Sequence, residues 1–257
     1  MRFDPAREAQ LLLSAAQFLT RLPLRPRSYD PEWLPRGAKY FPLVGLLVGL
    51  IGAAALLLAA RFWPAPLPQI LAIGATILAT GAFHEDGLAD SADSLGGWTR
   101  EKRLAIMKDS RLGTYGAVAL GLSLALQVGA LAALPPLLAA SALLAAHAAG
   151  RLGPVLLMAT APYAGDLDAS RIEHRNDRPS PGEVAVAAVF GLAALALLPP
   201  ERAAMALLIG GGAALLFAQA LCRTLGGYTG DVLGGTVMVF QTAFLLAVAG
   251  EPARTLT

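Results

Sequence analysis

The sequence predicts an all-α integral membrane protein, a polytopic bundle of about seven transmembrane helices preceded by an amphipathic N-terminal segment. Three observations predict this fold class. The 257 residues are 56% hydrophobic and only 15% charged, with a mean hydropathy of +0.58, which is too little charge to cover a soluble domain. Several apolar windows approach the length of about 20 helical residues that a bilayer core requires. Lysine and arginine, finally, concentrate in alternate connections between these windows.

The first element is the segment 8–20, which is apolar but contains Glu8, Gln10 and Gln17. These polar residues argue against a full span, so we expect an amphipathic or partly inserted helix. The windows that follow are 41–60, 67–83, 114–134, 137–158, 184–198, 203–221 and 232–249. The fifth window is short and ends at two prolines. No repeat and no linker divides the chain, so residues 1–257 are predicted to form a single domain.

The basic residues predict the orientation of the windows. With the N-terminus inside, the inner segments 1–40, 84–113, 159–183 and 222–231 hold sixteen Lys or Arg residues, and the outer segments hold three. Inner loops of membrane proteins carry such an excess of positive charge. The sequence therefore predicts an N-in topology with an odd number of spans.

Negative charge is concentrated in the stretch "FHEDGLADSADSLGG" (83–97), directly after an apolar window. Asp86, Asp90 and Asp93 stand at i, i+4 and i+7, so a helix aligns all three on one face. Stacked carboxylates repel one another, and a hard divalent cation removes that cost: Mg²⁺, or alternatively Mn²⁺, prefers oxygen ligands and binds through a few carboxylates plus substrate phosphates. We expect Gly87 to allow a phosphate or metal to come close. The simpler alternative is a solvated acidic loop.

Two further polar stretches are predicted on the same inner face. "IMKDSRLGTYG" (106–116) offers donors for phosphate oxygens, although its basic residues would also serve as a positive-inside anchor. "LGGYTGDVLGG" (225–235) contributes Asp231, which alternatively caps a helix.

Single polar residues give two more candidates. Arg151 lies deep in the fourth window, where an arginine is costly unless it is paired or faces water, so it is a functional candidate. His84 is a candidate ligand or proton relay, and alternatively a local hydrogen-bonding residue. Because Cys222 is the only cysteine, a cysteine-based zinc cluster and an internal disulfide are excluded.

Taken together, these stretches resemble the cobalamin synthase family, the adenosylcobinamide-GDP ribazoletransferases. The matching segments occur in the family's order and spacing over nearly the whole chain: "FLTRLP" (18–23), "FPLVGLLVG" (41–49), "GAFHEDGLADSAD" (81–93), "IMKDSRLGTYG" (106–116) and "LGGYTGDVLG" (225–234). The least distinctive region is 135–183.

The resemblance implies a multi-pass enzyme of the bacterial inner membrane, with a Mg²⁺-dependent active site facing the cytoplasm. It would join adenosylcobinamide-GDP to α-ribazole or α-ribazole 5′-phosphate, release GMP and so close the nucleotide loop of vitamin B12. The expected partners are these substrates and the lipid bilayer, with a second copy of the chain or other B12-assembly enzymes as further candidates. No nucleic-acid partner is expected.

The residue types fit phosphoryl transfer, which depends on positioning and on neutralising phosphoryl charge. We predict three roles. The metal ligands are Asp86, Asp90 and Asp93, joined by Asp231; the phosphate- and substrate-binding residues are Lys108, Arg111, Thr114 and Arg151, with His84. The candidate general bases are Glu85 and Asp109, between which only geometry can decide.

Two alternatives remain open. A CDP-alcohol phosphotransferase uses a related Asp-Gly signature, but the Ala-Arg pair expected after the glycine is replaced here by Leu88-Ala89. An ion-coupled transporter would hold carboxylates within its spans and show a repeat between its halves, and this sequence has neither.

Overall fold

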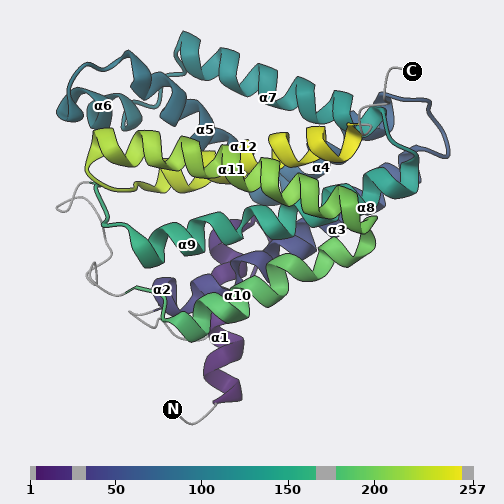
Figure 1. Ribbon diagram of the computed structural model, residues 1–257, viewed down its shortest axis with the longest axis horizontal. Coiled ribbons are helices and arrows are strands. Elements are labelled where there is room, and N and C mark those ends of the chain that lie inside the picture. Colours follow the sequence, from purple (N-terminus) through teal and green to yellow (C-terminus); the bar gives the residue numbers. More distant parts are fainter. Residues whose placement is uncertain (1–3, 25–32, 166–177, 251–257) are drawn as a thin grey trace.

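The computed structural model is built from helices, as the sequence predicts (Figure 1). It describes residues 4–24, 33–165 and 178–250. Within these ranges the only β-type pairing is an isolated bridge between Tyr163 and Tyr228.

Within the described ranges, five helical stretches are long and apolar enough to cross a membrane: Trp33–Ala59, Thr114–Ala132, Pro136–Thr160, Pro200–Leu225 and Gly230–Ala249. The first combines α2 (Trp33–Gly37), a 3₁₀ turn (Ala38–Tyr40) and α3 (Phe41–Ala59). The third combines α8 (Pro136–Gly150) and α9 (Leu152–Thr160), which meet at Arg151. The other three are α7 (Thr114–Ala132), α11 (Pro200–Leu225) and α12 (Gly230–Ala249).

A sixth candidate span is broken in the middle. Helix α4 (Leu67–Thr80) is followed by α5 (Phe83–Asp93) and a 3₁₀ turn (Ser94–Gly96), and the two parts are bent by 90°. The bend falls at Gly81 and Ala82, whose φ values of 70° and 60° are both left-handed. The predicted window 67–83 is therefore apolar throughout but ends in a corner.

The remaining predicted window, 184–198, corresponds to α10 (Pro181–Ala193) and a 3₁₀ turn (Ala194–Leu197), an apolar stretch too short to count among the candidate spans. The structure thus confirms an all-helical, multi-pass architecture, and the part of the chain that it describes holds five or six candidate spans, close to the predicted number of about seven. Window length alone does not separate a straight span from a bent or shortened one.

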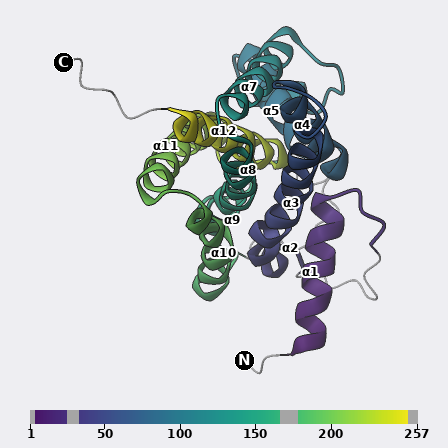
Figure 2. The same ribbon diagram turned by 90° about the vertical axis from the view of Figure 1, so that its right-hand side faces the viewer.

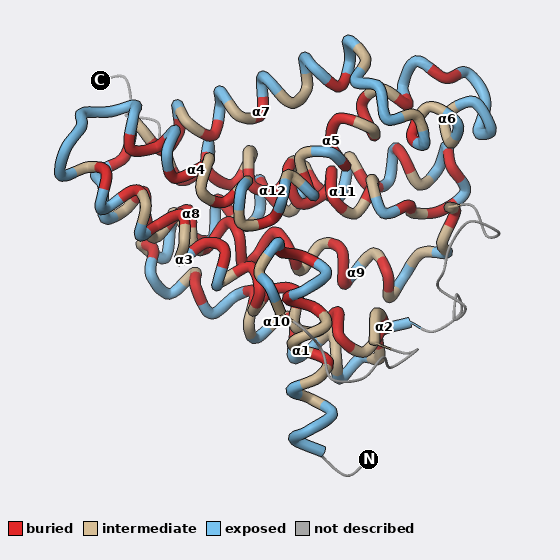
Figure 3. The backbone as a smooth tube through the Cα atoms, turned by 180° about the vertical axis from the view of Figure 1, so that it is seen from behind, coloured by how far each residue is buried: buried red, intermediate tan, exposed pale blue. Residues whose placement is uncertain are grey.

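Helices α8 and α12 lie in the middle of the bundle, and most of their residues are buried (Figure 3). Small residues allow the close packing. A Cβ atom on Gly49 of α3 would come within 2.8 Å of the Cα of Leu144 in α8, and a Cβ on Gly52 would be as close to Leu143. Membrane helices depend on such backbone approach because the hydrophobic effect does not drive their association within lipid.

Helix α1 (Pro5–Leu19) confirms the predicted N-terminal amphipathic segment. Asp4 caps its first turn through the N–H groups of Ala6 and Arg7, and one face of the helix is buried at Leu11, Ala15 and Leu19. The helix runs across the direction of α11 and α12 and its N-terminal end projects from the bundle (Figures 1 and 2).

The polar connections gather at one end of the bundle. The link from α5 to α7, which carries α6 (Arg100–Met107), lies at the left of Figure 1 with the turn between α11 and α12 and the C-terminal end of α9. The connections α3–α4, α7–α8 and α10–α11 lie at the opposite end. We call the first end the inner end, because it carries the segments that are rich in Lys and Arg.

Candidate active site

The acidic stretch forms the short helix α5, so Asp86, Asp90 and Asp93 lie on one helix as predicted. Positive φ angles at Gly81 and Ala82 end α4 and turn the chain before α5 begins. Asp86 is exposed, whereas Asp90 and Asp93 are partly buried.

Helix α12 crosses α5 at a contact between the two backbones. A Cβ atom on Gly87 would lie 2.8 Å from the carbonyl oxygen of Asp231 and 3.0 Å from the Cα of Gly234. The close approach that Gly87 permits is thus to α12, rather than to a ligand as we expected from the sequence. Thr229 accepts the N–H of Val232 at 3.3 Å and so caps α12. Asp231 lies in the first turn of α12, and its backbone carbonyl is at the contact with α5.

The carboxylates of Asp86, Asp90 and Asp231 form what we call the acidic cluster. The charges of Asp86, Asp231 and Asp93 all act on Asp90, and the charge of Asp86 acts on Asp231. The ion pairs within the described residues are Arg36–Glu183, Lys39–Glu8 and Arg111–Asp109, so none of them neutralises this cluster. Uncompensated like charges at the end of a membrane bundle favour binding of a cation.

The acidic cluster is not a closed coordination shell. In the described part of the chain, no group of three or more His, Cys, Asp or Glu side chains stands in a metal-binding arrangement. The donor type nevertheless suits Mg²⁺, which keeps several waters and takes only one or two carboxylates together with substrate phosphates. The residues therefore fit an open site that a diphosphate completes, and a cage made by the protein alone is not required.

Asp93 has a second function that the sequence did not reveal. Its Oδ2 accepts the N–H of Gly113 and its Oδ1 accepts the N–H of Gly116, both at 2.8 Å. The carboxylate of α5 thereby caps the first turn of α7, and a Cβ on either glycine would collide with it. The signal for this contact was the pair of glycines in "RLGTYG", since a carboxylate can come so close only where side chains are missing.

The donor-rich stretch follows α6 at the inner end. Lys108, Arg111 and Thr114 are exposed there, and Thr114 opens α7 next to the contacts of Asp93. Asp109 accepts a bidentate pair of hydrogen bonds from the guanidinium of Arg111, with Nε at 3.0 Å and 3.1 Å from the two oxygens. Arg111 lowers the pKa of the Asp109 carboxyl to about 2, which makes Asp109 a weak proton acceptor.

The three remaining predicted residues lie inside the protein. His84 is 5% exposed and Arg151 is 1% exposed, and the Oε2 atom of Glu85 is buried. Arg151 donates through Nη1 to the carbonyl oxygen of His147 at 2.9 Å. The structure therefore separates the predicted residues into a set at the inner end that is exposed or partly exposed, which we call the exposed set, and a buried set behind it. A contact of Arg151 or His84 with substrate stays a prediction.

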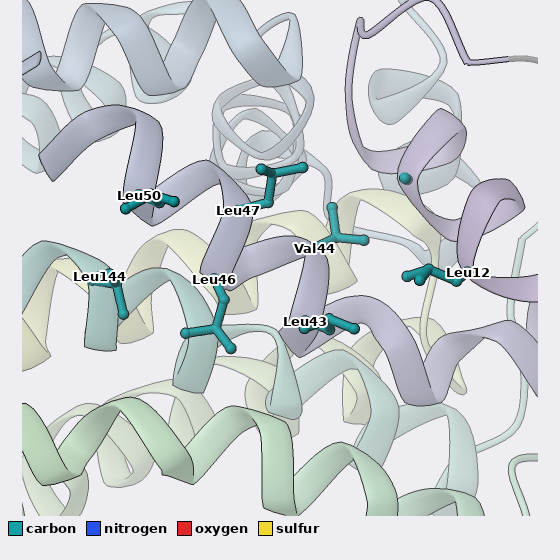
Figure 4. Close-up of a pocket in the computed structure, with 8 residues that line it drawn as sticks. Leu12, Leu43, Val44, Leu46, Leu47, Leu50 and Leu144 are labelled. Atoms are coloured by element: carbon teal, nitrogen blue, oxygen red, sulfur yellow. The ribbon is translucent and has the colours of Figure 1, made fainter. Parts of the chain in front are cut away.

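The apolar groove of Figure 4 is a different feature. It encloses about 480 Å³ between α1, α3 and α8, and all eight of its lining residues are apolar, among them Leu12, Leu47 and Leu144. None of the predicted site residues lines it, so it offers no chemistry to a diphosphate. The candidate site is the open acidic surface at the inner end.

Comparison with known proteins links this surface to one family. The model of the cobalamin-5-phosphate synthase family matches residues 11–249. A protein of Leptothrix cholodnii is 42% identical over 93% of this chain and 94% of its own, and one of Shewanella baltica is 38% identical over 95% and 96%. A protein of Shewanella putrefaciens is 37% identical over 94% of both chains. All three are named adenosylcobinamide-GDP ribazoletransferase. No solved structure matches the chain.

Proposed function

The chain belongs to the cobalamin-5-phosphate synthase family, and we propose that its acidic cluster is the place where the family's transfer reaction occurs. The activity is that of an adenosylcobinamide-GDP ribazoletransferase in cobalamin synthesis. The observation that carries the assignment is the match over residues 11–249, which includes every segment that builds the cluster. Neither a CDP-alcohol phosphotransferase nor a transporter is indicated by these relatives.

The reaction joins adenosylcobinamide-GDP to α-ribazole or its 5′-phosphate. A hydroxyl oxygen of the ribazole attacks the phosphorus that remains on cobinamide, the bond from this phosphorus to the oxygen of GMP breaks, and GMP leaves with the bonding electrons. The hydroxyl proton passes to a base. The product is adenosylcobalamin or its 5′-phosphate.

We assign the exposed set of residues to the diphosphate. One or two carboxylates of Asp86, Asp90 and Asp231, together with the diphosphate, would hold Mg²⁺, or alternatively Mn²⁺. Asp93 adds negative charge while it fixes the start of α7. When bound, the ion neutralises charge on the diphosphate oxygens and on the leaving group. Lys108, Arg111 and Thr114, which are exposed at the same end, would contact the remaining phosphate oxygens.

The geometry bears on the choice of base. Asp109 is held by Arg111, and Glu85 is buried with an unpartnered oxygen, so neither carboxylate is arranged as a free base at the surface. A member of the acidic cluster, or water next to it, is therefore the better acceptor for the ribazole proton. This proposal replaces both bases that we predicted from the sequence.

The protein is a multi-pass membrane protein, and we propose that it lies in the bacterial inner membrane with the acidic cluster facing the cytoplasm. The excess of Lys and Arg at the inner end supports this orientation. A second copy of the chain or another enzyme of cobalamin assembly remains a candidate partner.

The test is turnover by the purified protein in lipid vesicles. With adenosylcobinamide-GDP and each ribazole form in turn, we expect GMP and the corrinoid product in equal amounts. Supplying a CDP-alcohol substrate instead should give no reaction. Absence of GMP release from an inserted, folded protein would refute the assignment.

A further inference from the structure

A buried polar network lies behind the acidic cluster, at the junction of α8 and α9. Arg151 donates through Nη1 to the carbonyl oxygen of His147 at 2.9 Å and lies 3.2 Å from Nδ1 of the same histidine. Because a guanidinium has no acceptor, this Nδ1 must offer its lone pair, so His147 is neutral with its proton on Nε2. The side-chain nitrogen of Gln241, on α12, lies 3.0 Å from the same Nδ1.

Helix α3 packs directly against this network. A Cβ atom on Gly45 would lie 2.9 Å from Cδ of Arg151 and would collide with the carbonyl oxygen of His147. The arginine is therefore enclosed by α3, α8 and α12, and its 1% exposure leaves no route for its charge to reach bulk water in this arrangement. A charge enclosed in this way is strongly unfavourable unless it is paired.

A carboxylate of opposite charge is offered by Glu85 on α5. Nε and Nη2 of Arg151 and Oε2 of Glu85 are buried without hydrogen-bond partners among the described residues. The charges of these two side chains act on each other, yet the pair is absent from the direct ion pairs in that part of the chain. Two orphaned donors and one orphaned acceptor of opposite charge are the groups that an ordered internal water connects.

We propose that Glu85 and Arg151 form a buried, water-bridged ion pair that, with His147 and Gln241, fixes α5 relative to α8 and α12 and thereby positions the acidic cluster. Successive residues of a helix point about 100° apart, so α5 directs Glu85 inward and Asp86 outward. If the side chain of Glu85 is held in place, the direction of the Asp86 side chain is fixed as well. Arg151 and Glu85 are then positioning residues, and this role rests on the proposed function of the acidic cluster.

The test is a double-mutant cycle that removes the two charges separately and together. Glu85→Gln and Arg151→Met each leave one buried charge uncompensated, whereas the double variant leaves none. With protein in lipid vesicles we expect each single change to lower kcat roughly 10–100-fold by misplacing the acidic cluster. The KM for adenosylcobinamide-GDP should stay within about twofold, since the phosphate contacts are kept. The Mg²⁺ concentration for half-maximal rate should rise several-fold.

The double variant is the decisive member of the cycle. We expect it to be faster than either single variant and to unfold at a higher temperature, because the uncompensated charge is gone. Arg151→Lys should retain more activity than Arg151→Met. As a matched control, Gln127→Leu removes another buried amide, which bonds Ser123 and Thr242 between α7 and α12, and should lower the unfolding temperature without changing kcat.

Three results would overturn the proposal. If Arg151 binds phosphate directly, Arg151→Met raises KM at least roughly tenfold and adding Glu85→Gln restores nothing. If Glu85 is the general base, the double variant is as inactive as Glu85→Gln alone. If the decreases in unfolding temperature caused by the two single substitutions add up to the decrease in the double variant, the side chains are not paired. The unfolding temperatures are measured without turnover. They therefore test the buried ion pair even if the wild-type protein releases no GMP and the proposed function is wrong.

Discussion

Two polar regions, the acidic cluster and the buried network around Arg151, lie next to each other at the start of α5. Their charges are balanced in different ways. The acidic cluster contains only carboxylates, is partly exposed and has no basic partner in ion-pairing distance among the described residues. The buried network pairs a carboxylate with a guanidinium, a neutral histidine and an amide. The chain passes from one region to the other between Glu85 and Asp86.

The difference follows from access to water. Like charges at a solvated surface repel one another by modest amounts and remain available to a cation, whereas charges enclosed by helices must be balanced by the protein itself. The exposed region is therefore suited to binding and the enclosed region to holding it in place. Changes to the exposed region should accordingly act on turnover far more than on the unfolding temperature.

The largest effect should come from removing divalent ions. If the acidic cluster works only with a bound cation, EDTA should abolish GMP release completely and added Mg²⁺ should restore it. The buried network binds no metal, so the unfolding temperature of the protein in lipid should change little in chelator. Full turnover in EDTA would contradict a metal-dependent acidic cluster.

Neutralising one carboxylate of the cluster should be nearly as severe. Asp86→Asn keeps the shape of the side chain but removes a metal ligand, and we expect turnover to fall on the order of 10³-fold while membrane insertion is normal. Glu201→Gln, a change to an acidic residue in the first turn of α11 at the opposite end of the bundle, is the matched control and should leave turnover unchanged. Wild-type rates in Asp86→Asn would remove Asp86 from the site.

The sequence predicted the exposed region better than the enclosed one, and the reason is physical. Helical spacing is a local property, so the sequence alone suffices to place Asp86, Asp90 and Asp93 on one face of a helix. Arg151 could also be predicted as a functional candidate from the sequence alone, because an arginine in an apolar window is energetically costly. Its partners could not be found, because Glu85 and Gln241 are far from it in the chain and only the crossing of α5, α8 and α12 brings them near.

The bend between α4 and α5 could not be predicted from the sequence either. Apolar character continues through residues 67–83, so the window predicted a straight helix, while the left-handed conformation of Ala82 is one that a residue with a Cβ rarely adopts. In the structure, the N–H groups of Gly81 and Ala82 both donate to the carbonyl oxygen of Ile77 at this corner. The helical spacing of the aspartates likewise gave no sign that Asp93 caps α7, whereas the charges of Asp86 and Asp231 act on Asp90.

A smaller effect should follow from breaking that cap. Gly113→Ala places a Cβ against the carboxylate of Asp93, so α7 should lose its cap and the protein about 0.5–2 kcal/mol of stability. Because Asp93 also adjoins the acidic cluster, we expect turnover to fall roughly 10–100-fold. Gly121→Ala is the matched control on α7, since no atom lies within 4 Å of its added Cβ, and it should be neutral or stabilising. Equal behaviour of the two variants would show that the contact of Asp93 is unimportant.

The smallest effect should come from substituting Asp109. This substitution tests whether the ion pair of Asp109 with Arg111 has any part in catalysis. Arg111 lowers the pKa of Asp109 from 3.8 to about 2, so the carboxyl favours its charged form and any stability it adds is complete above pH 3.8 and lost only as the pH falls through about 2. No step in the rate between pH 5 and 8 can then originate from Asp109. Asp109→Asn should change turnover by only about twofold, as is usual for a surface substitution, and should leave the pH–rate profile unchanged. Loss of the acid limb of that profile in Asp109→Asn would instead make Asp109 the base, and the proton would then leave the ribazole at the α6–α7 link, outside the acidic cluster.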